Sequence, residues 1–297
     1  IEHSTILFDD PELNAYLQEI TDRMFPDMKG KLRVRTFRDP EFNAFAVATG
    51  GIYFHTGAPL RLDDEAQLAS VLGHEGTHVV ADHMYRHIKT AKTASRFAIL
   101  GTIVTLGYGI PVDLAGIVAY SSMAGFSRGY ERESDKGGFD RMVAVGYDAR
   151  GGDEAFARLA RELEMRHISQ GPYFFASHPN VEDRVATLPE FGGAPPPSGE
   201  RNTEPYRAVT MRARMNAVEQ IHRNGNGKVL VFLLEDEKIL ASLRPEARFY
   251  LADGYRLRAE KARKDPKDTR TEKEIEAQRA ADAVRAVEEY ERTIAEV

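Results

Sequence analysis

The string HEGTH at residues 74–78 is the feature that most constrains this chain. In a helix of about 100° per residue, His74 and His78 lie one turn apart on the same face, so both imidazoles can reach one tetrahedral metal ion. Glu75 then lies beside that ion, where a carboxylate is suited to take a proton from an attacking water. The HExxH spacing is therefore typical of a zinc hydrolase.

The residues around this motif predict the helix that the motif needs. Asp64 with Gln67 predicts an N-cap and a capping box, and apolar residues recur behind them at helical spacing. Gly73 and Gly76 are weak helix formers. Their presence predicts that another backbone or a substrate comes close to this helix.

Other histidines near the motif are not expected to bind metal. His83 and His87 fall about 180° and 220° around the helix from His74, which predicts that both face solvent. His55 lies in a predicted strand, where we expect a surface position.

Composition allows an enzyme and excludes some other classes of protein. The 297 residues are 42% hydrophobic and 29% charged, enough for one large domain and a smaller companion. The net charge of -6 gives no basic footprint for nucleic acid. The absence of cysteine excludes disulfides and thiolate zinc sites, so zinc would need His and carboxylate ligands. Because the chain begins at Ile1, we expect a trimmed form whose signal peptide has been removed.

A third metal ligand is predicted about fifty residues after the motif. Inward-facing positions of a second helix recur there at Glu131, Asp135, Gly138, Met142 and Val145. Glu133 points about 200° away from Glu131, so helical geometry favours Glu131 as the ligand. Asp135 is placed to accept the second ring N–H of a ligating histidine. The alternative for this segment is a charged helix start that faces solvent.

The order and spacing of four segments resemble the gluzincins and, more narrowly, metallopeptidase family forty-eight. The HExxH helix is followed by a Glu and, four residues later, an Asp; NAFAVATGGIYFHTG precedes it and ASHPNVEDRVATL follows the Glu. The resemblance covers roughly residues 5–190. It implies an α+β, zincin-like metalloprotease domain with a small mixed β-sheet, a zinc (Zn) cofactor, a polypeptide substrate and a periplasmic or cell-envelope location.

The segment before the metal helix predicts a pair of strands. Alternation over residues 52–56 indicates a strand with one buried face, with residues 43–47 as its neighbour at the sheet edge. Zincin proteases hold extended peptides along such an edge, so the resemblance makes this segment a candidate for substrate binding. The candidate residues are Asn43, Ala44, Phe45, Ala46 and Val47. A plain hairpin with nothing bound is the alternative.

The segment from Ser177 to Arg184 carries two further candidates. The resemblance implies that His178 can approach the metal and occupy its fourth position, and that Arg184 lies in the same cleft. Either residue could instead stabilise the oxyanion of the reaction, as hydrogen-bond donors do in hydrolases. Both roles for His178 stay open.

Two further regions complete the predicted organisation. The apolar stretch 97–120 is interrupted by Pro111 and is short for a membrane span, so we expect a lid or a peripheral membrane contact, with a core helix as the alternative. Residues 1–195 are assigned to the protease domain and 196–204 to a linker. Residues 205–297 are predicted to be helical and weakly similar to a tetratricopeptide pair.

The sequence thus predicts a zinc-dependent endopeptidase that hydrolyses extended, unfolded or misassembled polypeptides in envelope protein quality control, with autoinhibition possible. The alternative is a latent zinc-containing chaperone or assembly scaffold with little turnover.

Overall fold

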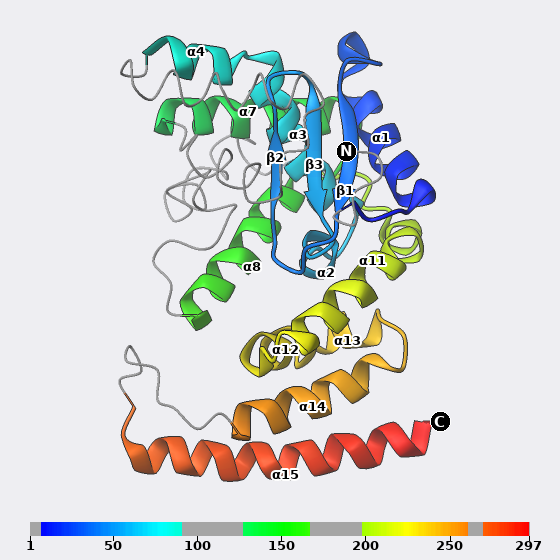
Figure 1. Cartoon of the computed structure of the whole chain (residues 1–297). Helices are drawn as coiled ribbons and strands as arrows, with labels where there is room; N and C mark the ends of the chain where they lie inside the picture. Colours follow the sequence, from blue (N-terminus) through cyan, green and yellow to red (C-terminus); the bar gives the residue numbers. More distant parts are fainter. Residues whose placement is uncertain (1–6, 91–126, 167–197, 261–269, 297) are drawn as a thin grey trace.

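The N-terminal half of the fold surrounds helix α3 (Figure 1). The computed structural model describes residues 7–90, 127–166, 198–260 and 270–296. The elements described in the N-terminal half are α1 (Pro11–Met24), the 3-10 turn η1 (Pro26–Met28), β1 (Arg33–Phe37), β2 (Ala44–Ala46), β3 (Gly51–His55), α2 (Ala58–Arg61), α3 (Glu65–Val80), α4 (His83–Thr90), α7 (Arg128–Ala144) and α8 (Arg150–Arg166). Those of the C-terminal half are α11 (Thr203–Arg223), α12 (Gly227–Leu234), α13 (Glu237–Ala241), α14 (Ala247–Glu260) and α15 (Glu272–Glu296). The predicted α+β class, with a small mixed sheet, is confirmed.

The described strands form one sheet in the order β1-β3-β2. β1 runs parallel to β3, whereas β2 is antiparallel to β3 and pairs Phe45 with Tyr53. The predicted strand pair is therefore confirmed, with β2 at the edge among the described strands. Because side chains alternate between the two faces of a strand, Ile52 and Phe54 of β3 share a face and enter the core that also contains Leu72 of α3.

The opposite face of the sheet corrects the prediction for His55. This side chain is fully buried, with its ring centroid 6.0 Å from that of Phe37 and 6.2 Å from that of Phe45. Its Nδ1 atom lies 3.7 Å from an Asp39 carboxylate oxygen. Alternation predicts that one face of a strand is buried, but it does not reveal that both faces of this short strand are covered.

Helix α3 begins as its sequence predicts. The Asp64 side chain accepts the backbone N–H of Gln67 at 3.0 Å, which caps the helix. The Gln67 side chain accepts a backbone N–H in return, but from Asp63 rather than from Asp64. Every residue from Glu65 to His78 is buried, so the predicted metal motif lies in the interior.

The C-terminal helices are joined directly to the N-terminal core. Tyr206 of α11 is fully buried and donates its hydroxyl to the backbone carbonyl of Pro59 at 2.8 Å. Just before α11, the Arg201 carbonyl accepts the backbone N–H of Glu65, and the Arg201 guanidinium contacts Asp64 at 2.8 Å. Arg201 thus contacts the start of α3, and Tyr206 contacts α2. The domain boundaries at 195 and 205 stay predictions.

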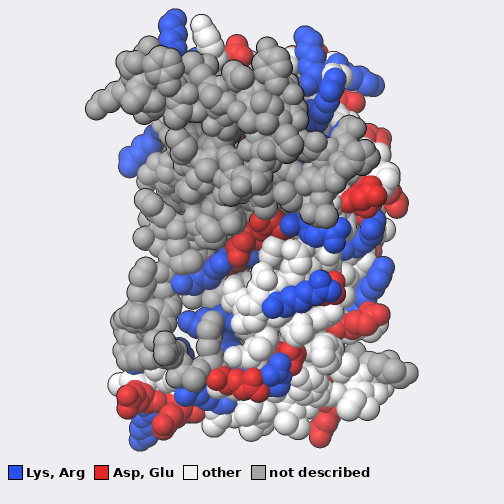
Figure 2. Space-filling view, viewed as in Figure 1, with Lys and Arg blue, Asp and Glu red and all other residues white. Residues whose placement is uncertain are grey.

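A second apolar core lies among the C-terminal helices and includes Leu230 of α12 and Leu251 of α14. Helices α14 and α15 pack side by side as a pair at one end of the molecule (Figure 1). On the face shown in Figure 2, basic and acidic side chains of the described residues are interspersed. The similarity of this region to a tetratricopeptide pair stays a prediction.

Several predicted features lie outside the described residues. They are the apolar stretch 97–120, the first two residues of the predicted linker, and the segment that contains His178 and Arg184. Within the parts of the chain that the structure describes, no helix is both long and apolar enough to cross a membrane.

Candidate metal centre

Two neighbouring turns of α3 and the first turn of α7 bring three ligand-type side chains together. His74, His78 and Glu131 each offer one ligand atom, and these atoms all lie within 4.8 Å of one another. The Nε2 atoms of the two histidines are 3.0 Å apart, and each lies 3.6 Å from a Glu131 carboxylate oxygen. All three side chains are buried. The predicted ligand set therefore converges on one point.

The spacing of these atoms suits a tetrahedral ion. Zinc bonds of about 2.0–2.1 Å place neighbouring ligand atoms roughly 3.3 Å apart, between the observed 3.0 and 3.6 Å. Two imidazole nitrogens and one carboxylate form a donor set typical of catalytic zinc sites, which keep a fourth position open. The residues present therefore fit a zinc ion, although their role as ligands stays a proposal.

A close contact between glycines allows α7 to approach the metal helix. A Cβ atom added to Gly73 of α3 would lie 3.0 Å from the Gly138 Cα atom of α7. A Cβ atom on Gly138 would lie 2.7 Å from the His74 backbone nitrogen. Both glycines are thus required where the helix backbones touch, as expected for Gly73. This contact sets the separation at which Glu131 reaches the two histidines.

Two further acidic residues of α7, Asp135 and Glu133, take different positions relative to Glu131. Asp135 is buried, and its carboxylate accepts from the Nδ1 atom of His74 at 2.9 Å. Glu133 is 46% exposed and forms an ion pair with Arg86 at 2.9 Å. These positions agree with the helical angles from which Glu131 and Asp135 were predicted to face inward.

The prediction that His83 faces solvent is wrong. Its side chain is fully buried, and its Nδ1 atom lies 3.0 Å from the Nδ1 atom of His78. Helix α3 ends at Val80, and Asp82 has a left-handed φ of 52°, so the angle of 100° per residue does not extend to His83. An Asp at this position is the sequence signal for the turn, because Asp adopts positive φ more readily than most residues. His87, by contrast, is half-buried.

The surroundings of His83 favour its neutral form. Burial lowers its pKa, although the nearby Glu133 carboxylate opposes this shift. Its ring stacks on Tyr130 with 4.7 Å between centroids, and the Ser134 hydroxyl lies 3.2 Å from its Nδ1 atom. Reasoning from the sequence missed this histidine as part of the site.

The remaining predicted site residues that the structure describes lie on α3 or at the edge strand β2. Glu75 is buried and follows His74 directly on α3. Asn43 precedes strand β2 and is also buried, as are Ala44 and Phe45.

The order of these residues along the chain matches a known family. The sequence model of peptidase family M48 matches residues 9–191, which is more than half of the chain. This chain belongs to peptidase family M48. The matched region contains HEGTH and Glu131, and it ends before α11.

Comparison with curated proteases shows how far the similarity extends. The putative beta-barrel assembly-enhancing protease of Vibrio cholerae is 29% identical over 256 residues, covering 82% of this chain and 51% of that protein. The beta-barrel assembly-enhancing protease of Escherichia coli K12 is 26% identical over 62% of this chain and 39% of its own length. The mitochondrial metalloendopeptidase OMA1 of Schizosaccharomyces pombe is 28% identical over 56% of this chain and 47% of its own length. The chain thus spans about half the length, or less, of these relatives.

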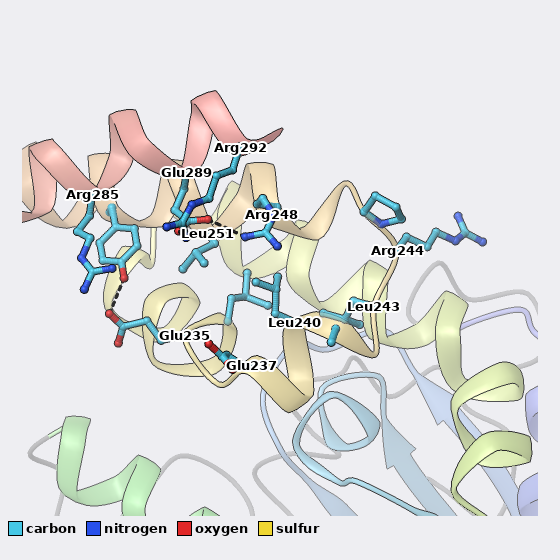
Figure 3. Close-up of a pocket in the computed structure, with 14 residues that line it drawn as sticks. Glu235, Glu237, Leu240, Leu243, Arg244, Arg248, Leu251, Arg285, Glu289 and Arg292 are labelled. Carbon is cyan, nitrogen blue, oxygen red and sulfur yellow. Dashed lines mark hydrogen bonds and ion pairs between the residues drawn. The ribbon is translucent and has the colours of Figure 1, made fainter. Parts of the chain in front are cut away.

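A pocket of about 800 Å³ lies elsewhere, between the C-terminal helices (Figure 3). Leu240, Leu243 and Leu251 line it, and the Glu289 carboxylate contacts Arg248 at 2.9 Å and Arg292 at 2.7 Å. Among the predicted site residues that the structure describes, none lines this pocket. It is therefore separate from the candidate metal centre.

Proposed function

We propose that this chain is a zinc-dependent endopeptidase that cleaves extended or unfolded polypeptides. The observation that carries the proposal is the buried convergence of His74, His78 and Glu131 beside Glu75. Membership of peptidase family M48 supports it. The two bacterial relatives are named for enhancing beta-barrel assembly, which supports a role in envelope protein quality control.

Glu75 is the residue to which we assign the proton transfers. A bound zinc ion would supply Lewis-acid chemistry, polarising the peptide carbonyl and making water more acidic. Glu75 accepts a proton from the attacking water and passes it to the leaving amine. Asp135 holds the His74 ring through its Nδ1 atom, so that Nε2 points at the other two ligands.

The outer edge of β2 is the part of the fold to which we assign substrate binding. The backbone N–H of Val47 donates to Gly51, and the backbone carbonyl of Asn43 accepts from His55, so residues 43 and 47 bond toward β3. In an antiparallel ladder the alternate residues, Ala44 and Ala46, then direct their N–H and C=O groups to the other side. No described strand pairs there, so an extended peptide could add to the sheet.

Cleavage of an unfolded protein tests the proposal. Purified chain with a measured zinc content should degrade casein, and a zinc chelator should stop the reaction. A chain that binds zinc but does not cleave would favour the alternative function, a chaperone or assembly scaffold with little turnover.

We also propose that His178 keeps the enzyme latent by occupying the fourth metal position. A neutral imidazole is a good zinc ligand and can compete with water for an open position. His178→Ala should then raise casein cleavage and self-cleavage with zinc retained. A fall of roughly ten- to a thousandfold, with zinc retained, would instead assign His178 to oxyanion stabilisation.

A further inference from the structure

The two ring nitrogens of His78 face different groups. The Nε2 atom lies on the side of the candidate metal position, 3.0 Å from His74 Nε2 and 3.6 Å from Glu131. The Nδ1 atom lies on the opposite side of the ring, 3.0 Å from the Nδ1 atom of His83. Each nitrogen of His78 therefore has its own neighbour.

Hydrogen-bond chemistry fixes which nitrogens carry hydrogen when His78 ligates a metal. A neutral imidazole that offers its Nε2 lone pair to an ion carries its hydrogen on Nδ1. The Nδ1 atom of His78 must then donate, so the Nδ1 atom of His83 must accept. His83 consequently carries its own hydrogen on Nε2, which lies 3.2 Å from a Glu133 carboxylate oxygen.

We propose that His83 is the positioning residue of His78. It holds the His78 imidazole by accepting its Nδ1–H, and the Glu133 carboxylate orients the His83 ring in turn. This inference rests on the metal site of the proposed function. Each proposed histidine ligand then has an outer partner, that is, a residue that contacts the ring nitrogen facing away from the metal position. His83 is the outer partner of His78, and Asp135 is that of His74, at 2.9 Å. Such partners fix the tautomer and the ring orientation of a ligating histidine.

A role in packing alone would depend on the shape of His83 and not on its acceptor atom. The ring stacks on Tyr130 with 15° between the planes, so a ring of similar size is part of the local packing. His83→Phe keeps an aromatic ring but removes the acceptor. His83→Asn removes the ring but places an amide oxygen close to the position of Nδ1. The two variants therefore separate shape from hydrogen bonding.

Zinc affinity is the decisive measurement, made by competition with a chromophoric chelator in the Glu75→Gln protein to prevent self-cleavage. His83→Phe should weaken zinc binding by about 10- to 100-fold, the usual effect of losing an outer partner, and His83→Asn should recover most of that loss. Parent-like affinity in His83→Phe, or equal losses in both variants, would overturn the proposal. If the Glu75→Gln parent itself fails to bind zinc, the proposed function fails instead.

The tautomers can also be measured without changing His83. Nitrogen-15 NMR of histidine-labelled, zinc-loaded Glu75→Gln protein distinguishes N–H from lone-pair nitrogens in each ring. We expect hydrogen on Nδ1 of His78 and on Nε2 of His83. Hydrogen on Nδ1 of His83 would contradict the assignment, whether or not the His83 variants fold.

Discussion

Ion pairs of similar length lie in different surroundings in the two halves of the molecule. In the N-terminal half, the side chains of Arg61 and Glu162 are 1% and 7% exposed and meet at 2.8 Å. In the C-terminal helices, Glu289 is 5% exposed, but its partners Arg248 and Arg292 are 25% and 58% exposed (Figure 3). Distance alone therefore does not measure the strength of a pair, because water screens the second arrangement far more than the first.

The candidate metal centre is buried in the same way as the pair of Arg61 and Glu162. The side chains of His74, His78 and Glu131 are each 3% exposed, and Asp135 and His83 occupy the positions behind the histidines. A charged or polar group that loses its partner in such a place cannot turn to water. We therefore expect substitutions at the metal centre and at Arg61 to have large effects, and those at the pocket to have small ones.

The largest effect is expected from Glu75→Gln. The substitution removes the group that accepts and returns the proton, but none of the proposed ligands, so casein cleavage should fall by about 10²- to 10⁴-fold with zinc content unchanged. Cleavage assays and metal analysis of the same preparation measure both quantities. An active Glu75→Gln enzyme would exclude the proposed mechanism.

Glu131→Gln should lose zinc, and Glu133→Gln is its matched control. Glu131 lies 3.6 Å from both histidine Nε2 atoms, whereas Glu133 lies behind His83 and is half-exposed. Loss of a ligand should weaken zinc binding by more than the roughly 10- to 100-fold expected for an outer partner such as Asp135. Glu133→Gln should retain zinc, because Glu133 contacts His83 and Arg86. If Glu133→Gln loses more zinc than Glu131→Gln, the assignment of α7 faces is wrong.

Arg61→Met should destabilise the fold by about 3 kcal/mol, because it leaves the Glu162 carboxylate buried without its main partner. Arg166, which contacts Glu162 at 3.3 Å, compensates only in part. Urea unfolding of the parent and the variant measures the difference. A loss below about 1 kcal/mol would place this pair in the class of surface ion pairs.

The same pair predicts a dependence of stability on pH. Burial by itself raises the pKa of Glu162, but Arg61 and Arg166 outweigh burial and hold the pKa below its ordinary value. Because the folded-state pKa is the lower one, this stabilisation is present above the unfolded value of about 4.3 and is lost as pH falls through the folded value. Arg61→Met should therefore lose less stability than the parent on acidification from pH 5 to pH 3.

The smallest effect is expected from Arg292→Ala. Arg292 is 58% exposed and shares Glu289 with Arg248, so its removal should change the free energy of unfolding by less than about 1 kcal/mol. Zinc content and cleavage should match those of the parent. A destabilisation above about 2 kcal/mol would remove the distinction between the two halves.

Local signals predicted most of the helix and strand framework around the candidate site. The Asp64 cap, the buried face of α3 and the orientation of Glu131 relative to Glu133 all follow from spacing within single elements. His83 was misplaced because one non-glycine residue with positive φ, Asp82, changes the direction of the chain. An angle calculated along a helix holds only as far as the helix continues.

Contacts between distant segments could not be predicted from local patterns. Arg61 and Glu162 are 101 residues apart in sequence, and neither belongs to a motif that indicates a partner. Gly73 predicts the close approach of another backbone or a substrate, but not that its neighbour is Gly138 of α7. Burial of His55 likewise depends on what covers the second face of the sheet.

The contacts of Arg201 and Asn202 connect the C-terminal half to the metal helix. The Arg201 carbonyl receives the Glu65 N–H, the Arg201 guanidinium holds the Asp64 cap, and the Asn202 amide donates to the Glu65 carboxylate at 2.9 Å. A fragment cut at residue 195 would leave the first turn of α3 without these anchors. A force applied to α11 would therefore act on Glu65, which is the first residue of the helix that carries His74 and His78.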